Sequence, residues 1–256
     1  MSEAPQDAIR AYYRTLFSGW GRQHWWPAQS RFEVIVGAYL TQNTAWTNVE
    51  KALGNLRRAR LLSIRGIRRI PQTQLERLIR PAGYFRQKAQ RVKTFVRFLD
   101  ERYGGSLARM LARPTAELRE ELLALNGVGP ETADSILLYA GNHPVFVVDA
   151  YTRRILDRHG MVSSAAGYDE IRQLFEQALG GTRGPRWSFG GAPTLKAGPR
   201  GSSHPPSAVS EARRPPVVQV FNEMHGLIVG VGKNYCLKSQ PQCEQCPLQK
   251  FLPEAK

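Results

Sequence analysis

The stretch that most constrains this chain is an apolar helical pattern from Leu122 to Ala140, interrupted once by Asn126-Gly-Val-Gly129. Pro130 suits the first turn of a helix, because it has no N–H to leave without a partner and its φ is already helical. Glu131 places a negative charge near the positive end of the helix dipole. The pattern therefore predicts two helices joined by a tight turn over residues 116–140, the second beginning at Pro130.

The turn between these helices has the composition of an anion site. Gly127 and Gly129 lack side chains, so their backbone N–H groups, with those of Val128 and Thr132, are expected to approach a phosphate beside a helix N-terminus. An ordinary glycine-containing turn is the alternative. Other features of the sequence are needed to distinguish a phosphate site from an ordinary turn.

Net charge favours the phosphate. The chain has 36 Lys and Arg against 21 Asp and Glu, a net charge of +15 and a pI near 10.2. Such an excess indicates a polyanionic partner, with nucleic acid the first choice and an anionic membrane surface the second. The mean hydropathy is −0.39, no membrane span is evident, and Met1–Asp7 has neither a basic leader nor an apolar segment. We therefore expect a cytoplasmic protein, associated with the nucleoid through DNA binding, and no membrane partner.

The pattern of elements predicts an all-α fold. The only strand-like run, Val145–Val148, has nothing to pair with. Helices are expected over 150–158 and 168–179, and capping boxes are expected at Ser30 with Glu33 and at Thr73 with Glu76. Residues 180–216 are rich in Gly and Pro and are expected to form a flexible insert, either a tolerated surface insertion or a loose electrostatic arm.

Asp149 is the first candidate catalytic residue. It stands 20 residues after Gly129 at the expected N-cap of a helix, and capping alone would explain it. A carboxylate near a bound phosphate could also stabilise the positive charge that develops on a sugar as its glycosidic bond breaks, or activate a water there.

These two segments together resemble a known family. Leu125–Ala133 followed by Val147–Asp149 is similar to the helix-hairpin-helix-GPD superfamily of DNA glycosylases, in its endonuclease III branch. The resemblance implies a two-lobed all-α fold: a six-helix barrel lobe, 31–143, with the helix-hairpin-helix at 116–140, and a terminal lobe, 1–30 and 144–256. It also implies that a damaged base is flipped from double-stranded DNA into a pocket between the lobes, where Asp149 helps to cleave the N-glycosidic bond. We expect the protein to act as a monomer.

The segment Phe32–Thr44 resembles the family's second helix and the loop that enters the duplex. This likeness would make Gln42 the intercalating residue, with Asn43 beside it at the DNA.

Glu131 is a departure from the strand-cleaving members. In those enzymes a Lys two residues after the second hairpin glycine forms a Schiff base with the sugar, and this chain has Glu131 there. The family pattern therefore predicts base excision without AP-lyase activity. Glu131 could help to position water, or it could only satisfy the helix dipole.

Three tryptophans suggest a substrate class. Trp25, Trp26 and Trp46 flank the expected intercalation loop, and a cationic alkylated purine stacks well on indole rings. The pattern is most similar to the 3-methyladenine DNA glycosylase subgroup. The alternative is that these side chains only fill space between the lobes.

All three cysteines lie near the C-terminus, at Cys236, Cys243 and Cys246, a spacing that matches three ligands of the family's iron–sulfur loop. The fourth ligand is missing, since Leu252 stands in its place. A weakened 4Fe–4S cluster, a vestigial loop held by packing and a three-Cys zinc site all remain open. Lys233, Lys238 and Lys250 around this loop are expected to face DNA.

The leading hypothesis is thus a monofunctional base-excision glycosylase for alkylated purines. A non-catalytic DNA-binding relative and an endonuclease III-like glycosylase for oxidised or mismatched bases are the alternatives.

Overall fold

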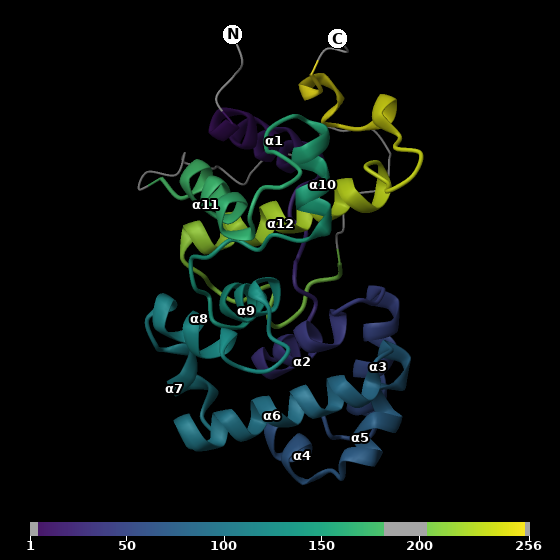
Figure 1. Ribbon diagram of the computed structural model, residues 1–256, viewed down its shortest axis with the longest axis vertical. Coiled ribbons are helices and arrows are strands. Elements are labelled where there is room, and N and C mark those ends of the chain that lie inside the picture. The colour runs from purple at the N-terminus through teal and green to yellow at the C-terminus, as the bar shows by residue number, and fades with distance from the viewer. Residues whose placement is uncertain (1–4, 182–203, 254–256) are drawn as a thin grey trace. The chain divides into compact units, whose positions relative to one another are not determined.

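The computed structural model describes residues 5–181 and 204–253, and within these residues every regular element is helical. The predicted all-α class is confirmed (Figure 1). The chain divides into two compact units: unit 1, residues 1–27 and 144–256, and unit 2, residues 28–143. No helix of the described residues combines the length and the apolar character needed to cross a membrane.

Unit 2 is built around α2 (Arg31–Thr41), which is buried on nearly every side from Phe32 to Leu40. Ser30 caps this helix, its Oγ accepting a hydrogen bond from the Glu33 N–H at 3.1 Å. Four helices contact it directly, namely α3 (Trp46–Arg58), α6 (Phe85–Tyr103), α9 (Pro130–Ser135) and η2 (Ile136–Ala140). The remaining helices of the unit pack on these, namely α4 (Ile64–Arg69), α5 (Gln72–Ile79), η1 (Arg80–Ala82), α7 (Leu107–Leu111) and α8 (Thr115–Leu123).

The two helices of the hairpin are locked together by a buried ion pair. Arg119 on α8 donates from Nε to Asp134 on α9 at 2.7 Å, and the Asp134 side chain is fully buried. A second bond runs from Arg119 Nη2 at 3.2 Å. Because such a bidentate interaction fixes both the distance and the orientation of the two side chains, it helps to set the geometry of the turn that joins the helices.

Unit 1 is organised on α12 (Pro216–Asn234), whose residues from Val220 to Gly232 are buried without interruption. Helices α1 (Pro5–Trp20), α10 (Ala150–Arg158) and α11 (Tyr168–Leu179) contact it. Two short turns, η3 (Cys243–Gln245) and η4 (Gln249–Phe251), follow. A helix buried on all faces needs neighbours on all faces, and the three helices that contact α12 supply them.

The expected insert at 180–216 is only partly visible. Residues 182–203 lie outside the described residues. Residues 204–215 are described and make specific contacts with the segment after α1, among them a backbone hydrogen bond from His204 N to Gln23 O at 3.1 Å. At least this part of the segment therefore has a defined conformation.

One expected helix start is wrong. Thr73 does not cap a helix, because α5 begins one residue earlier at Gln72 with Pro71 at the N-cap position. Pro71, whose ring fixes φ near the helical value, takes the N-cap position without a side-chain cap bond, and Thr73 therefore lies inside the first turn of α5.

Candidate active site and nucleic-acid interface

Asp149 occupies the N-cap of α10, as its position in the sequence predicts. Its Oδ1 accepts hydrogen bonds from the Thr152 N–H at 2.8 Å and from the Thr152 hydroxyl at 2.9 Å. Its Oδ2 lies 3.6 Å from Nε2 of His225 on α12. The carboxylate is thus fixed by α10 on one oxygen and faces a histidine with the other.

This environment keeps Asp149 ionised. Burial by itself raises the pKa of a carboxyl group, but the interaction with His225 and the two bonds from Thr152 outweigh it, and the pKa of Asp149 lies below its ordinary value. A group that remains negative at neutral pH can stabilise a developing positive charge without giving up a proton.

His225 is the residue of this site that the sequence did not reveal. It is 4% exposed on α12, between the Trp25 ring at 6.0 Å and the Phe146 ring at 6.3 Å, both edge to face. Its separation from Asp149 by 76 positions leaves no periodic signal.

Trp25 and Trp26 lie in the same unit as Asp149. Both are buried, with ring centroids 5.8 Å apart, and the His225 ring that faces Asp149 lies 6.0 Å from the Trp25 ring. Lys233 Nζ lies 5.9 Å from the centre of the Trp25 ring. Two of the three predicted tryptophans and the predicted carboxylate therefore belong to one cluster in unit 1.

Trp46 belongs to unit 2 instead, at the first position of α3, where it is half-buried.

The hairpin turn has the conformation that its glycines allow. Gly127 has φ +78°, a left-handed value that other residues rarely adopt, and a Cβ there would overlap the Arg91 guanidinium. Gly129, the N-cap of α9, has open space where a Cβ would be. Val128 is buried and Thr132 is 7% exposed. The turn is therefore tightly packed at Gly127 and open at Gly129.

Gln42 is joined to this turn. Its Nε2 donates to the Gly127 carbonyl at 2.9 Å and to Thr132 Oγ1 at 3.0 Å, while its Oε1 accepts from Arg91 Nη1 at 2.5 Å. Asn43, the next residue, is exposed with φ +53°. For Gln42 to enter a duplex, as its likeness to the family's loop predicts, these three bonds would have to be exchanged for bonds to DNA.

Glu131 is exposed on the first turn of α9, the position at which the family resemblance leads one to expect a lysine in the strand-cleaving members. The lysine of unit 2 that is most buried, Lys88, donates to the carbonyls of Leu40 at 2.9 Å and Ala82 at 2.8 Å. Its amine is therefore engaged in the core and is held by two acceptors.

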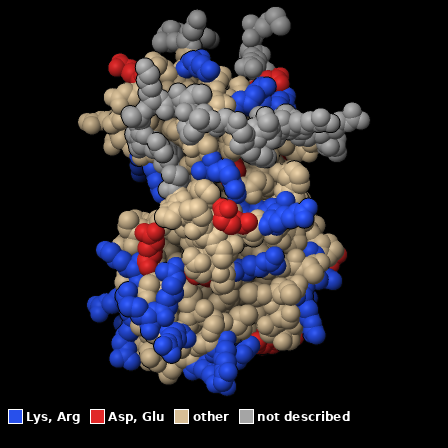
Figure 2. Space-filling model, turned by 180° about the vertical axis from the view of Figure 1, so that it is seen from behind, with Lys and Arg blue, Asp and Glu red and all other residues tan. Residues whose placement is uncertain are grey.

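Basic side chains spread over the protein surface. Figure 2 shows a face on which Lys and Arg are numerous and Asp and Glu are few. Beside the hairpin turn, an open groove in unit 2 is lined by Gln72, Arg86, Gln87, Gln90, Arg91 and Asn126. At the start of α6 Tyr84 is 67% exposed, and Arg80 and Arg86 lie 5.9 Å from the neighbouring Phe85 ring. A groove of cations and amides beside an exposed aromatic ring suits a nucleic acid.

The three cysteines and Leu252 line one small cavity, together with residues of α10 and α12. Burial, helped by the neighbouring thiols, raises the pKa of Cys246. No group of three or more His, Cys, Asp or Glu side chains within residues 5–181 and 204–253 is arranged to hold a metal ion. With an apolar side chain at the fourth position, these residues do not fit a cluster held by four cysteines.

Two arginines of α10 hold this loop instead. Arg158 donates to Cys236 Sγ at 3.2 Å and to the carbonyls of Leu237 and Lys238 at 2.7 and 3.1 Å. Arg154 donates to the Cys236 carbonyl at 2.7 Å. Protein hydrogen bonds thus supply direct support for the loop.

Comparison with known proteins identifies the class. A profile of the HhH-GPD superfamily of base excision DNA repair proteins matches residues 36–180. A candidate DNA repair glycosylase of Methanocaldococcus jannaschii, MJ1434, is 39% identical over 98% of this chain and 98% of its own. Bovine endonuclease III-like protein 1 is 26% identical over 90% of this chain, which spans 61% of that protein.

Solved structures of DNA glycosylases are similar to this chain. A 3-methyladenine DNA glycosylase of H. pylori, bound to 1,N6-ethenoadenine, has a TM-score of 0.70 and 26% identity over 90% of this chain and 98% of that one. An endonuclease III trapped on DNA has a TM-score of 0.72 at 20% identity over 99% and 97%, a likeness of fold. The chain belongs to the HhH-GPD superfamily of base excision DNA repair proteins. It is a homologue of DNA glycosylases.

Proposed function

We propose that this protein is a monofunctional DNA glycosylase that hydrolyses the bond between an alkylated purine and its sugar. The observation that carries the proposal is the ionised Asp149, fixed by Thr152 and facing His225 beside Trp25. A negative charge and an indole ring in one cluster suit a cationic base attached to a sugar.

The chemistry follows from these charges. As the glycosidic bond breaks, its electron pair moves to the base, which leaves neutral, and positive charge develops on the sugar. Asp149 stabilises that charge. Water then adds to the anomeric carbon and loses a proton, which gives an intact abasic site. The open turn at Gly129 and the basic groove of unit 2 would hold the phosphates.

Glu131 supports the absence of strand cleavage. Lyase chemistry needs an unprotonated amine that can attack the sugar, and a carboxylate cannot form a Schiff base. The alkylated substrate is supported by the tryptophans and by the likeness to the H. pylori enzyme, which its structure shows with 1,N6-ethenoadenine.

A panel of duplexes, each with one defined lesion, tests the proposal. Base release should occur with alkylated purines, strand nicking should require added alkali, and borohydride should trap no covalent protein–DNA adduct. Excision only of oxidised or mismatched bases would reject the substrate class. Efficient borohydride trapping would reject the monofunctional mechanism, and binding with no excision of any lesion would indicate a non-catalytic DNA-binding protein.

A further inference from the structure

Residues 204–211, here called the strap, run beside the segment that bears Trp25 and Trp26. We propose that the strap is a specificity element that determines which damaged bases the Trp25–Trp26 site accepts, a role that rests on the function proposed above. The strap lies outside residues 36–180, the part of the chain that the family model matches.

The strap contacts both tryptophan residues. The His204 ring lies 5.4 Å from the Trp25 ring, tilted by 46°, and the His204 N–H donates to the Gln23 carbonyl at 3.1 Å. The Ser207 hydroxyl donates to the Trp26 carbonyl at 3.4 Å. One end of the strap thus lies against the Trp25 ring and its middle against the Trp26 backbone.

The strap has a defined conformation of its own. Ser207 N donates to Ser210 Oγ at 2.8 Å, and Ser210 N donates back to Ser207 Oγ at 3.2 Å. Both serines are buried, as is Val209 between them. A turn that is bonded in both directions and packed on an apolar side chain keeps its shape, so the strap can act as a wall.

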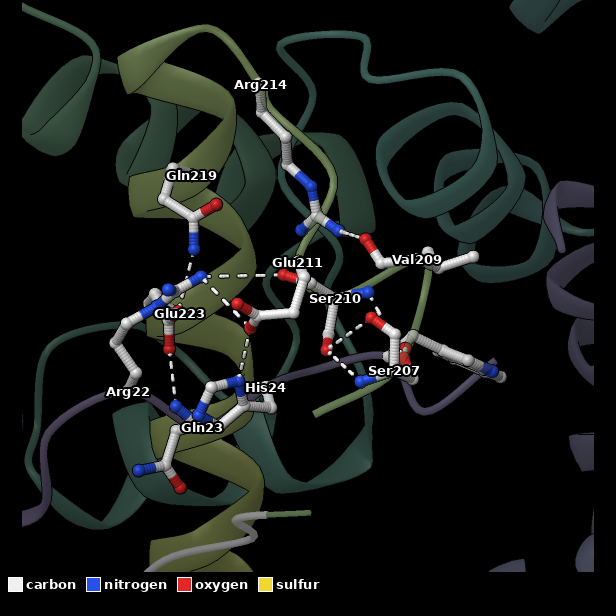
Figure 3. Close-up of polar contacts among 11 residues, drawn as sticks. Arg22, Gln23, His24, Ser207, Val209, Ser210, Glu211, Arg214, Gln219 and Glu223 are labelled. Atoms are coloured by element: carbon white, nitrogen blue, oxygen red, sulfur yellow. Dashed lines mark hydrogen bonds and ion pairs between the residues drawn. The ribbon is translucent and has the colours of Figure 1, made fainter. Parts of the chain in front are cut away.

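Charged side chains fasten the far end of the strap, as Figure 3 shows. Glu211 Oε1 lies 2.7 Å from His24 Nδ1 and 3.8 Å from Arg22 Nη2. Arg22 also donates to the Ser210 carbonyl at 3.5 Å. The residues just before Trp25 are therefore tied to the strap by their side chains.

Helix α12 holds the same residues from the other side. Glu223, which is 1% exposed, accepts from the Gln23 N–H at 2.7 Å and lies 3.5 Å from Arg22 Nε. Gly226 allows close approach, since a Cβ there would lie 3.0 Å from Gln23 Cβ and 3.1 Å from Trp25 Cβ. With α12 behind and the strap in front, Trp25 has little freedom to move away from a larger ligand.

His204 is the strap residue best placed to select among bases. Trp25 is 6% exposed and the His204 ring lies 5.4 Å from its ring, so a base that stacks on Trp25 would have to share space with side chain 204 or displace it, and the size of that side chain would limit the size of the base. Adding or removing a small apolar group in such a site changes discrimination by roughly 10- to 200-fold.

Single-turnover excision tests this directly. Rates are measured on two duplexes that differ only in the lesion, 3-methyladenine or the larger 1,N6-ethenoadenine, with the parent, His204→Ala, His204→Phe and Ala208→Ser. Ala208 is an exposed strap residue and serves as the matched control. His204→Ala should raise the ratio of the ethenoadenine rate to the methyladenine rate about tenfold. His204→Phe, which keeps a ring, and Ala208→Ser should stay within about twofold of the parent.

An unchanged ratio in His204→Ala, or an equal fall of both rates, would overturn the proposal. A second measurement needs no catalysis: the Kd of the free base 1,N6-ethenoadenine, by equilibrium dialysis on the full chain. His204→Ala should change this Kd at least threefold relative to the parent and to Ala208→Ser. If the parent excises neither lesion, the proposed function fails, and the Kd alone tests the role of the strap. Unequal Kd values for His204→Ala and the parent support that role, and equal values reject it.

Discussion

At the scale of single residues, Asp149 combines two roles that a sequence cannot separate. A plain N-cap needs only the two bonds from Thr152. It does not need a buried histidine 3.6 Å from the second carboxylate oxygen. The second interaction is the reason to assign chemistry to this carboxylate as well as capping.

Asp149→Asn should lower single-turnover base excision by roughly a hundredfold, since removal of such an electrostatic contribution costs about 3 kcal/mol. Asparagine is itself a good cap, so the folded fraction should be maintained. Asp157→Asn, an exposed acid on the same helix, is the control and should retain parent activity. Equal rates for Asp149→Asn and Asp157→Asn would remove Asp149 from the mechanism.

Lys88 is a second residue whose environment has a measurable consequence. It is 1% exposed and donates to two carbonyl oxygens, and burial, with a smaller contribution from Arg91, lowers the pKa of Lys88 to about 8. The neutral amine still has two N–H groups for its two acceptors, so loss of the proton need not cost a hydrogen bond.

The stability of the parent should therefore rise with pH. The unfolded chain binds more protons at this site than the folded chain between pH about 8 and the ordinary lysine pKa of 10.5, so the free energy of unfolding increases across that window and is unaffected by Lys88 below it. Urea unfolding at pH 7 and 9.5 measures the increase. Lys88→Met should lose this part of the pH dependence and should be less stable at both pH values, because two buried carbonyls lose their donor. The same pH dependence in parent and variant would contradict this account.

At the scale of elements, the hairpin separates packing from ligand binding through its two glycines. Gly127→Ala should destabilise the fold by roughly 1–2 kcal/mol, because alanine is strained at φ +78° and its Cβ would displace Arg91. Gly129→Ala should leave the free energy of unfolding within about 0.5 kcal/mol, since a Cβ there meets nothing within 4 Å.

Duplex binding should show the opposite order: relative to the stability that each variant loses, Gly129→Ala should weaken binding more than Gly127→Ala. If the N–H groups at Gly129 approach a phosphate, a methyl group there should weaken binding to undamaged DNA about tenfold, close to the loss of one charge-assisted hydrogen bond. Fluorescence anisotropy on two unrelated sequences measures the effect, which should be equal for both. Parent affinity in a folded Gly129→Ala protein would assign the open turn to chain geometry alone.

The elements differ in how well the sequence predicts them. The sequence predicts helices over 150–158 and 168–179, and the structure has the same bounds for α10 and α11. Both have clear signals: Asp149 caps the first, and Gly167 precedes and Gly180 follows the second. At Thr73 the local pattern fitted a cap equally well, but Pro71 had already fixed the start of the helix.

Side-chain partners are harder to predict than element bounds. Ser30 receives the predicted bond from Glu33 N, yet the Glu33 carboxylate accepts from Gln29 N at 3.2 Å and pairs with Arg57. His225 and the strap are likewise tertiary features: their partners lie 76 and about 180 positions away. Periodicity and spacing carry no record of such pairs, so the structure is needed to find them.

At the scale of the whole molecule, the property with the clearest consequence is the positive net charge. The chain has 36 Lys and Arg against 21 Asp and Glu and a net charge of +15, so its basic side chains cannot all be paired with an acidic partner of their own. Positive charges without acidic partners repel one another and destabilise the folded protein. Binding of a polyanion removes this repulsion. This makes a quantitative prediction about salt.

Affinity for undamaged duplex should fall steeply with salt. Each phosphate neutralised by Lys or Arg contributes about −0.9 to the slope of log affinity against log salt, so about five contacts would lower affinity roughly five-hundredfold between 50 and 200 mM. Arg86→Gln, in the groove beside the hairpin, should make the slope less negative by about one unit, because one contact is lost. Arg172→Gln is the control, since Arg172 is paired with Asp169 and Glu176 in unit 1. An affinity that does not change with salt would contradict backbone phosphates as the main contacts, whereas a parent-like slope in Arg86→Gln with a steep slope overall would move the interface away from the groove.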